Sequence, residues 1–200
     1  AWGLAAGLTG VAGALIATVD VFTPILDDPY DWGRVAATNA FSDVYAMGGT
    51  PAMALNVAGW PVDDLPLELL ARVLQGGQDV AGDAGAVVVG GHTITATEPL
   101  YGMVALGFAD ADRLVRNSTA APGERLFLTK PIGTGLIATA IKRGSATPEQ
   151  AEAAVRTMTT LNAAAAGDSV RSPQPVQSSS RQRSRYRSAR SRSATPHHNA

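Results

Sequence analysis

Hydrophobic patterning in this sequence ends at Gly167, and that boundary limits which part of the chain can fold. Residues 168–200 consist mainly of Ser, Arg, Pro and Gln and hold almost no large apolar side chain. Such a segment cannot bury enough apolar surface to offset the conformational entropy that folding removes, so we expect a disordered tail. The core must therefore come from residues before Gly167, in a chain that is 46% apolar overall.

Charge divides the chain at the same place. Residues 1–167 carry 9 Lys+Arg against 16 Asp+Glu, whereas residues 168–200 carry 7 Arg and one acid. A reading-frame slip in GC-rich coding DNA produces such an Arg- and Ser-rich run, and we favour a frameshift product as the explanation. The less favoured alternative is a protein that binds nucleic acid phosphates through this tail.

The first 19 residues carry no charge, and this length is close to what a membrane span needs. Four glycines, the lack of a basic start and the directly following Asp20 argue against a span or a signal peptide. We expect residues 1–12 to be an atypical Gly/Ala-rich lead-in to a buried strand. The absence of cysteine excludes disulfides and thiolate metal sites, and it suits a cytoplasmic protein. We also expect no membrane contact, because the N-terminal stretch does not have the features of a span.

Strand and helix patterns mix along the chain before Gly167, which predicts the α+β class. The Gly76-Gly77 pair should weaken the middle of the helix that contains it. The expected strands are 14–22, 52–60, 86–91 (short and buried) and 100–109, and the expected helices are 30–47 and 66–85.

The later part of the chain predicts a second, incomplete domain. We expect an N-terminal domain over residues 13–112 and a polar linker over 113–124. Residues 125–167 would then start the second domain, with a strand from Arg125. The expected helices of this part are 133–144 and 147–166.

Asp43 is a lone carboxylate among apolar neighbours, and burying it is costly unless it has a partner. Asn39 lies four residues earlier on the same face of the expected helix, and Asp20 ends the preceding strand. Carboxylate and amide oxygens suit Mg²⁺, which takes phosphate oxygens and water for its other ligands. The equally weighted alternative is that Asp43 pairs with Arg34 or accepts from a neighbouring backbone N–H.

Two further segments carry residues that bind anions. Gly90-Gly91, followed by His92 and Thr93, would let a phosphate or a base approach the backbone closely. The alternative there is a tight turn with His92 bonded locally. Lys130 lies near the start of an expected helix, where an anion could bind, although it could equally be a surface charge.

Three stretches of the sequence resemble selenophosphate synthetase (selenide, water dikinase), of the aminoimidazole ribonucleotide synthetase-like ATP-binding superfamily. They are "TVDVFTPILDDPYDWGRVAATNAFSDVYAMGGTPAMALNVAGWP", "GGHTITATEPLYGMVALG" and "LFLTKPIGTGLIATAIKRG". The likeness runs from about Ala14 to Ala166. It implies an N-terminal α/β sandwich domain that binds ATP, followed by the start of a second α+β domain.

The resemblance also implies an activity, in which ATP, selenide and water give selenophosphate, AMP and phosphate. Selenophosphate supplies selenium for selenocysteine and selenouridine synthesis. In this family ATP binds with Mg²⁺ at a homodimer interface. Asp43 matches the aspartate that binds Mg²⁺ and ATP, and Asp20 matches an aspartate that contacts ATP. The segment Gly91, His92 and Thr93 matches one that contacts the nucleotide from the partner subunit.

The departures from the family pattern concern catalysis. Four elements of the family pattern have no counterpart in this sequence. They are the catalytic Cys or selenocysteine, the Lys that follows it, an Asp-Asp-Ala stretch before Asp20, and a "TDVTGFG"-like string after the last helix. These departures predict a copy that is truncated at both ends, incomplete and inactive, with no catalytic residue of its own. The alternatives are an inactive nucleotide-binding homologue or another ATP-dependent kinase or synthetase of the superfamily.

Overall fold

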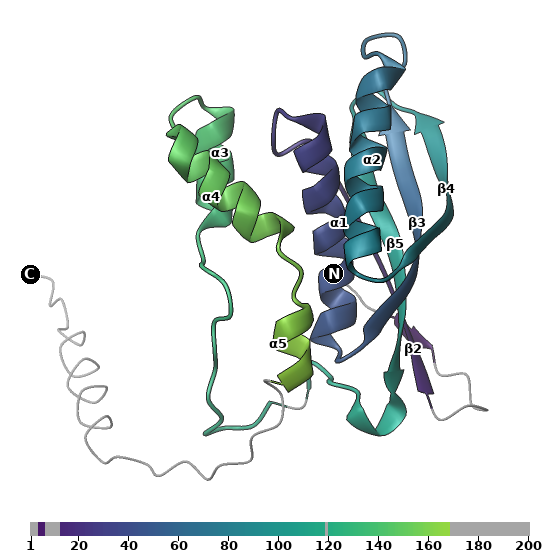
Figure 1. Cartoon of the computed structure of the whole chain (residues 1–200), viewed down its shortest axis with the longest axis vertical. Helices are drawn as coiled ribbons and strands as arrows, with labels where there is room; N and C mark the ends of the chain where they lie inside the picture. The colour runs from purple at the N-terminus through teal and green to yellow at the C-terminus, as the bar shows by residue number, and fades with distance from the viewer. Residues whose placement is uncertain (1–3, 7–12, 119, 169–200) are drawn as a thin grey trace, which may run out of the picture. The chain divides into compact units, whose positions relative to one another are not determined.

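The computed structural model describes residues 4–6, 13–118 and 120–168 (Figure 1). The described residues up to Ser118 and from Leu126 to Asp168 form one compact unit, and residues 120–125 belong to a second. The expected tail lies outside the described residues apart from Asp168. Of the expected lead-in, only Leu4–Ala6 is described, and it forms a short strand that the sequence did not predict.

A five-stranded mixed sheet is the centre of the described structure, in the order β1-β2-β5-β3-β4. Every pair of neighbours is antiparallel except β3 and β4, which are parallel. This mixture confirms the α+β class. The strands are β1 (Leu4–Ala6), β2 (Gly13–Phe22), β3 (Thr50–Trp60), β4 (Val87–Thr95) and β5 (Leu100–Asp110).

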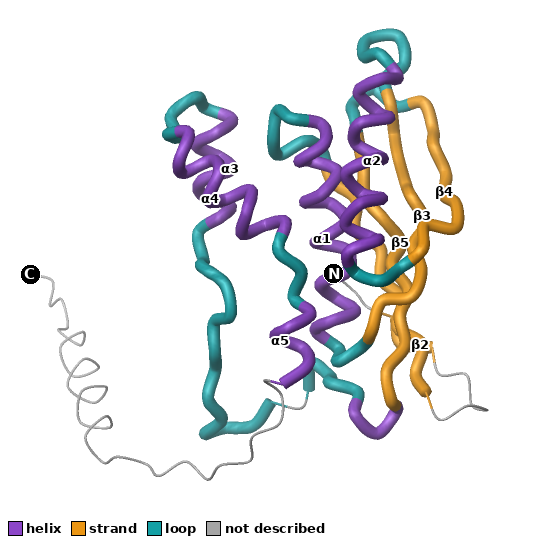
Figure 2. The backbone as a smooth tube through the Cα atoms, viewed as in Figure 1, coloured by secondary structure: helices purple, strands orange, loops and turns teal. Residues whose placement is uncertain are grey.

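Helices α1 (Pro29–Ala46) and α2 (Leu67–Asp83) cover one face of this sheet (Figure 2). Helix α1 starts where the sequence predicts, because the Asp28 side chain accepts from the Asp31 N–H at 2.8 Å and Pro29 occupies the first turn. It ends before Gly48, whose φ of 74° favours glycine. The face toward the sheet is buried and rich in alanine, so helix and sheet pack closely.

Glycines bring α1 and α2 into direct backbone contact. A Cβ added at Gly76 would lie 2.1 Å from the Tyr30 carbonyl oxygen, and one added at Gly33 would lie 2.0 Å from the Val73 carbonyl oxygen. At Gly77 an added Cβ would meet the buried Tyr101 hydroxyl at 1.9 Å. The Gly76-Gly77 pair therefore costs helix propensity but allows the two helices to pack without a side chain between them.

Three sequence predictions about the other elements are wrong. Residues 125–130 are not a strand, because no strand among the described residues pairs with them, and Leu126 is 96% exposed. The helix expected over 147–166 is two helices, α4 and α5, separated at residues 160–162. The strand expected at 86–91 is longer and exposed, because it lies at the edge of the sheet.

The chain after β5 is helical. The short 3-10 helix η1 follows β5, and α3 starts after Gly133. Helix α4 carries a capping box, in which Thr147 and Gln150 bond each other's backbone N–H. None of the helices in the described part of the chain is long and apolar enough to cross a membrane. The bounds are η1 (Ala111–Arg113), α3 (Thr134–Lys142), α4 (Pro148–Thr159) and α5 (Ala163–Asp168).

Candidate ATP and metal site

Asp20 and Asp43 lie on facing elements. Successive side chains of a strand alternate between the faces of a sheet, so Thr18 and Asp20 of β2 both point toward α1. The Thr18 hydroxyl donates to Asp43 Oδ2 at 2.9 Å. Asp43 therefore has a neutral partner on the strand that carries the second carboxylate.

Burial raises the pKa of Asp20 above its ordinary value, and the nearby charge of Asp43 raises it further. A carboxylate that is partly buried beside a second negative charge, as Asp20 is, lies in an environment that a cation would relieve. No cluster of three or more His, Asp or Glu exists in the described part of the chain. Mg²⁺ commonly uses only one or two carboxylates together with phosphate oxygens, so the pair fits this ion when a phosphate is present.

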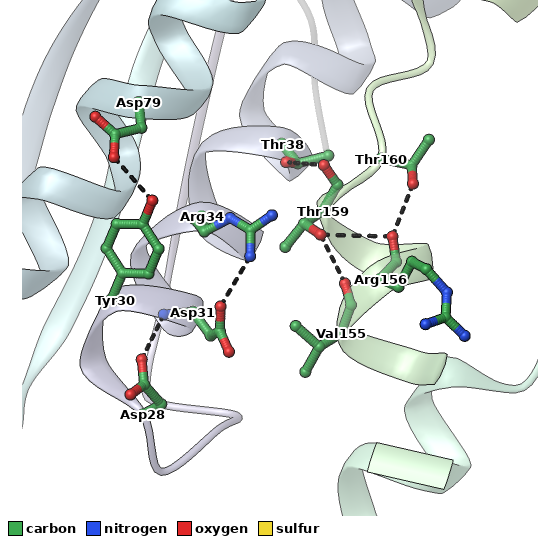
Figure 3. A network of polar contacts seen from close by, with 10 residues as sticks. All are labelled: Asp28, Tyr30, Asp31, Arg34, Thr38, Asp79, Val155, Arg156, Thr159 and Thr160. Atoms are coloured by element: carbon green, nitrogen blue, oxygen red, sulfur yellow. Dashed lines mark hydrogen bonds and ion pairs between the residues drawn. The ribbon is translucent and has the colours of Figure 1, made fainter. Parts of the chain in front are cut away.

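The alternative ion pair between Arg34 and Asp43 is wrong. Arg34 Nη1 instead pairs with Asp31 Oδ1 at 3.0 Å, within the first turns of α1 (Figure 3). Its guanidinium also lies 5.7 Å from the centre of the Tyr30 ring, a cation–π distance. Arg34 thus stabilises the start of α1, and the Asp43 carboxylate instead accepts from the Thr18 hydroxyl.

Asn39 and Lys130 lie apart from the carboxylate pair. Both line a cavity of about 510 Å³ beside α1, whereas neither Asp20 nor Asp43 does. Burial lowers the pKa of Lys130. The sequence grouped Asn39 with Asp43, but the structure joins Asp43 to Asp20 and Thr18 and puts Asn39 in the cavity. The cavity is lined by Ile25, Val35, Thr38, Asn39, Ser42, Lys130, Pro131, Thr134, Gly135, Ala138, Thr139, Lys142, Thr157 and Met158.

Gly91, His92 and Thr93 lie within β4, so the alternative of a tight turn is wrong. The strand register pairs His92 with Val57, on the face of the sheet that α1 and α2 leave open. Gly91 pairs with Asn56 on the covered face, where an added Cβ would lie 2.2 Å from the Asn56 carbonyl oxygen.

These residues are far from the carboxylates within one chain. Asp20 lies on β2 and the Gly91–Thr93 segment on β4, with β5 and β3 between them. Three strand spacings correspond to about 14 Å. The structure therefore does not bring the two predicted groups together in one subunit.

Three residues at these sites, Thr18, Ser42 and Lys142, were not predicted from the sequence. Thr18 could have been found, because a strand of period two puts it on the same face as Asp20. Ser42 accepts from Asn162 Nδ2 at 3.0 Å, a contact between residues 120 positions apart that no local pattern predicts. Lys142 lies at the end of α3, and lysine is common in the last turn of a helix, so its position gives no sign of a binding site.

Comparisons with known proteins agree with this fold. Residues 5–109 match the family described as AIR synthase related protein, N-terminal domain. The selenide, water dikinase of Geobacter metallireducens is 52% identical over 154 residues, which cover 77% of this chain and 45% of that protein. The selenide, water dikinase of Photorhabdus laumondii is 49% identical over 148 residues, covering 74% of this chain and 43% of that protein. The chain thus spans less than half the length of these curated relatives.

Solved structures share the fold at lower sequence identity. Thiamine monophosphate kinase from Aquifex aeolicus superposes with a TM-score of 0.67 and 23% identity, covering 78% of this chain and 56% of that one. A structure of AaThiL complexed with AMPPCP and TMP has a TM-score of 0.69 and 20% identity, covering 82% of this chain and 54% of that one. The extent of the likeness expected from the sequence, about three quarters of the chain, is confirmed. The chain belongs to the AIR synthase related family, whose N-terminal domain it contains.

Proposed function

We propose that this chain is the Mg·ATP-binding part of a selenide, water dikinase. The observation that carries the proposal is the Asp20–Asp43 pair, in which Asp43 accepts from Thr18, in a chain about half identical over its matched part to proteins of that name. The structure of AaThiL with AMPPCP, which shares the fold, supports nucleotide binding. The whole reaction would convert ATP, selenide and water to selenophosphate, AMP and phosphate.

In this proposal the chain's residues hold and align the nucleotide. Thr18 fixes the orientation of Asp43 through its hydroxyl, so that the other carboxylate oxygen remains for a ligand. Asp20 and Asp43 would hold Mg²⁺, which neutralises phosphate charge when it is bound. The buried sheet beneath them keeps both carboxylates in place before any ligand binds.

A second candidate function is a nucleotide-binding homologue without selenide chemistry. The chain has no cysteine, and its first lysine is Lys130. Both candidates share the Mg·ATP site, so both predict nucleotide binding, and only the first predicts a role in selenium transfer within a complete protein.

The proposed site is tested by ligand-induced stabilisation of the full chain. We expect saturating ATP with Mg²⁺ to raise the Tm by about 5 °C, since a ligand that binds only the folded state stabilises it. ATP in EDTA and Mg²⁺ alone should each give a much smaller shift, because the carboxylates repel metal-free ATP and the pair alone holds Mg²⁺ weakly. Equal shifts with ATP in Mg²⁺ and in EDTA would contradict the proposal.

We further propose that the chain forms a homodimer through the open face of its sheet. Helices α1 and α2 cover only the opposite face, and the open face presents Val19, which is 58% exposed, and Phe108, which is 52% exposed. In the register, Val104 of β5 pairs with Val19, and Leu106 of β5 pairs with Met53 of β3, so further apolar residues share this face. An apolar surface of this kind favours association. His92 lies on the same open face and would be near the partner subunit, whereas Asp43 lies on the opposite, helix-covered side of the sheet.

The substitution Phe108→Asp tests the dimer. A symmetric interface would contain two buried aspartates, so we expect the dimer dissociation constant to rise at least about tenfold. Sedimentation velocity across a concentration series measures it. The matched control is Leu67→Asp, an equally exposed apolar residue on α2 away from the open face, which should leave the dimer intact. A wild-type chain that stays monomeric, or equal disruption by both variants, would contradict the proposal.

We also propose a division of the chain into domains. Residues 13–112 would be the ATP-binding domain, 113–124 a linker and 125–167 the start of a second domain. The exposed apolar side chains of Leu126, Phe127 and Leu128 support this, because a complete domain would cover them. We place the protein in the cytoplasm, in agreement with its lack of cysteine.

A further inference from the structure

Both lysines of this sequence line the same cavity. The chain has only two lysines, Lys130 and Lys142, and they lie before and at the end of α3. Each contributes to the wall of the 510 Å³ cavity beside α1. Residues 1–167 are acidic overall, so two cations at one cavity are a local reversal of charge.

No acid of the described ranges, 4–6, 13–118 and 120–168, pairs with this charge. None of the cavity-lining residues is Asp or Glu. Neither lysine forms an ion pair with any acid in the part of the chain that the structure describes. Lys130 donates one hydrogen bond to the Thr160 carbonyl oxygen, which leaves two of its three N–H groups for a ligand. The cavity therefore has a net positive charge that an anion would neutralise.

Other donors face the same space. Asn39 and Thr134 line the cavity, and their side chains have no hydrogen-bond partner among the described residues. Helix α3 has no side-chain cap, and its first intrahelical bond comes from the Leu136 N–H, so the N–H groups of Thr134 and Gly135 have no intrahelical acceptor. The Lys130 ammonium, the Asn39 amide, the Thr134 hydroxyl and the free backbone N–H groups form a set that suits a phosphate, and Lys142 adds positive charge from the other end of α3.

The volume of the cavity and its apolar wall indicate that the ligand carries an organic group in addition to a phosphate. A volume of about 510 Å³ lies in the range of cavities that hold small organic ligands and far exceeds the size of a phosphate ion. Ile25, Val35 and Met158 supply apolar wall. We propose that this cavity binds a phosphate monoester, with Lys130 on the phosphate, Lys142 adding positive charge to the cavity, and the apolar residues against the organic group.

This site differs from the proposed Mg·ATP site in its chemistry. The carboxylate pair needs a cation to approach phosphate, whereas the lysine cavity needs none. Asp43 bonds to β2 and does not line the cavity, whereas Asn39 and Ser42 of the same helix do, so the two sites are neighbours along α1. Two bonds connect the walls of the lysine cavity. Thr38 Oγ1 donates to the Thr159 carbonyl oxygen at 3.4 Å (Figure 3), and Asn162 Nδ2 donates to Ser42 Oγ.

The test is calorimetric titration of the full chain in EDTA, so that no metal site contributes. The probe is phenyl phosphate, with benzyl alcohol as the neutral probe and AMP as the nucleotide probe. We expect phenyl phosphate to bind the wild type, and the double substitution Lys130→Ala with Lys142→Ala to weaken it at least about tenfold. Replacing both lysines by arginine should restore most of the affinity, because the charge is kept.

The matched control is Arg143→Ala. Arg143 is the exposed neighbour of Lys142 and does not line the cavity, so its removal should change the affinity less than about twofold. Lysine-dependent binding of AMP as well as phenyl phosphate would support the site and identify a nucleotide as its ligand. Binding of phenyl phosphate but not AMP would support the site and indicate that its ligand is a phosphate monoester smaller than a nucleotide. The proposal is overturned if phenyl phosphate does not bind, if benzyl alcohol binds as well, or if Arg143→Ala weakens binding as much as the lysine substitutions.

Discussion

Replacing Asp43 by Asn should lower the affinity for ATP in the presence of Mg²⁺ at least about 100-fold. The change removes one of two carboxylates that would hold the ion, and a neutral amide is a poor substitute for a charged oxygen ligand. Asn keeps an oxygen that can accept from the Thr18 hydroxyl, so the local packing should survive. Equilibrium titration with a fluorescent ATP analogue measures the effect.

The same substitution should stabilise the metal-free protein at neutral pH. The pKa of Asp20 is raised in the folded state, so the stability that depends on its protonation is fully present below the unfolded value of 3.8 and is lost as the pH rises through the folded value. The charge of Asp43 is one cause of this rise, and removing it lowers the folded pKa of Asp20. Urea unfolding should therefore show Asp43→Asn above wild type at pH 7, with a smaller difference near the unfolded pKa.

The control for both effects is Asp63→Asn. Asp63 is exposed in the loop before α2, so we expect its loss to change neither ATP affinity nor the pH dependence. If Asp43→Asn binds Mg·ATP like the wild type, Asp43 does not hold the metal. If it loses binding and also unfolds at lower urea concentration than the wild type, the carboxylate is structural rather than a ligand.

Replacing Gly76 by Ala should cost about 3 kcal/mol of unfolding free energy, the upper part of the usual range for overpacking. The new methyl group would lie 2.1 Å from the Tyr30 carbonyl oxygen and 3.0 Å from the Arg34 nitrogen, both backbone atoms of α1 that cannot rotate away. The two helices must separate, and the buried contacts between α1 and the sheet weaken with them. A loss of this size is a large fraction of the stability of a typical domain, about 5–15 kcal/mol.

The same helix supplies the control. An alanine at Gly82 would have no atom within 4 Å of its new methyl group, and Gly82 has no positive φ. Gly82→Ala should therefore stabilise the protein by about 0.5–1 kcal/mol through helix propensity. Urea unfolding of the two variants against wild type compares them directly. Equal stability of Gly76→Ala and Gly82→Ala would show that α1 and α2 do not pack through Gly76.

Local signals were sufficient for the first part of the fold. The cap at Asp28, the proline after it and the glycines after Met47 define α1 in the sequence, and the structure agrees to within one residue at each end. Caps and breakers act through neighbouring backbone atoms, so a single sequence contains the information. The α+β class followed from the same local patterns.

The errors concern properties that depend on distant residues. The segment from Arg125 has the composition of a strand, but a strand exists only where another supplies its hydrogen bonds. The strand that starts at Val87 has the apolar residues typical of a buried strand. Its burial depends on its position in the sheet, however, and β4 is the edge strand. The spacing of residues predicts which face of the helix carries Asp43, but only the packed structure shows that its hydrogen-bond partner is Thr18.

The ladder between β2 and β5 has a consequence for how the two proposed sites would respond to a ligand. Ten residues of β2, from Gly13 to Phe22, pair continuously with β5, so Thr18 and Asp20 belong to a part of the sheet that should exchange its amide hydrogens slowly. Lys130 instead lies on a segment without strand or helix, between exposed Leu128 and Ile132. The carboxylates are therefore rigid and preorganised, and affinity there depends on charge and fit. The lysine cavity must lose conformational entropy when it binds, so its affinity depends also on how far that segment is already ordered.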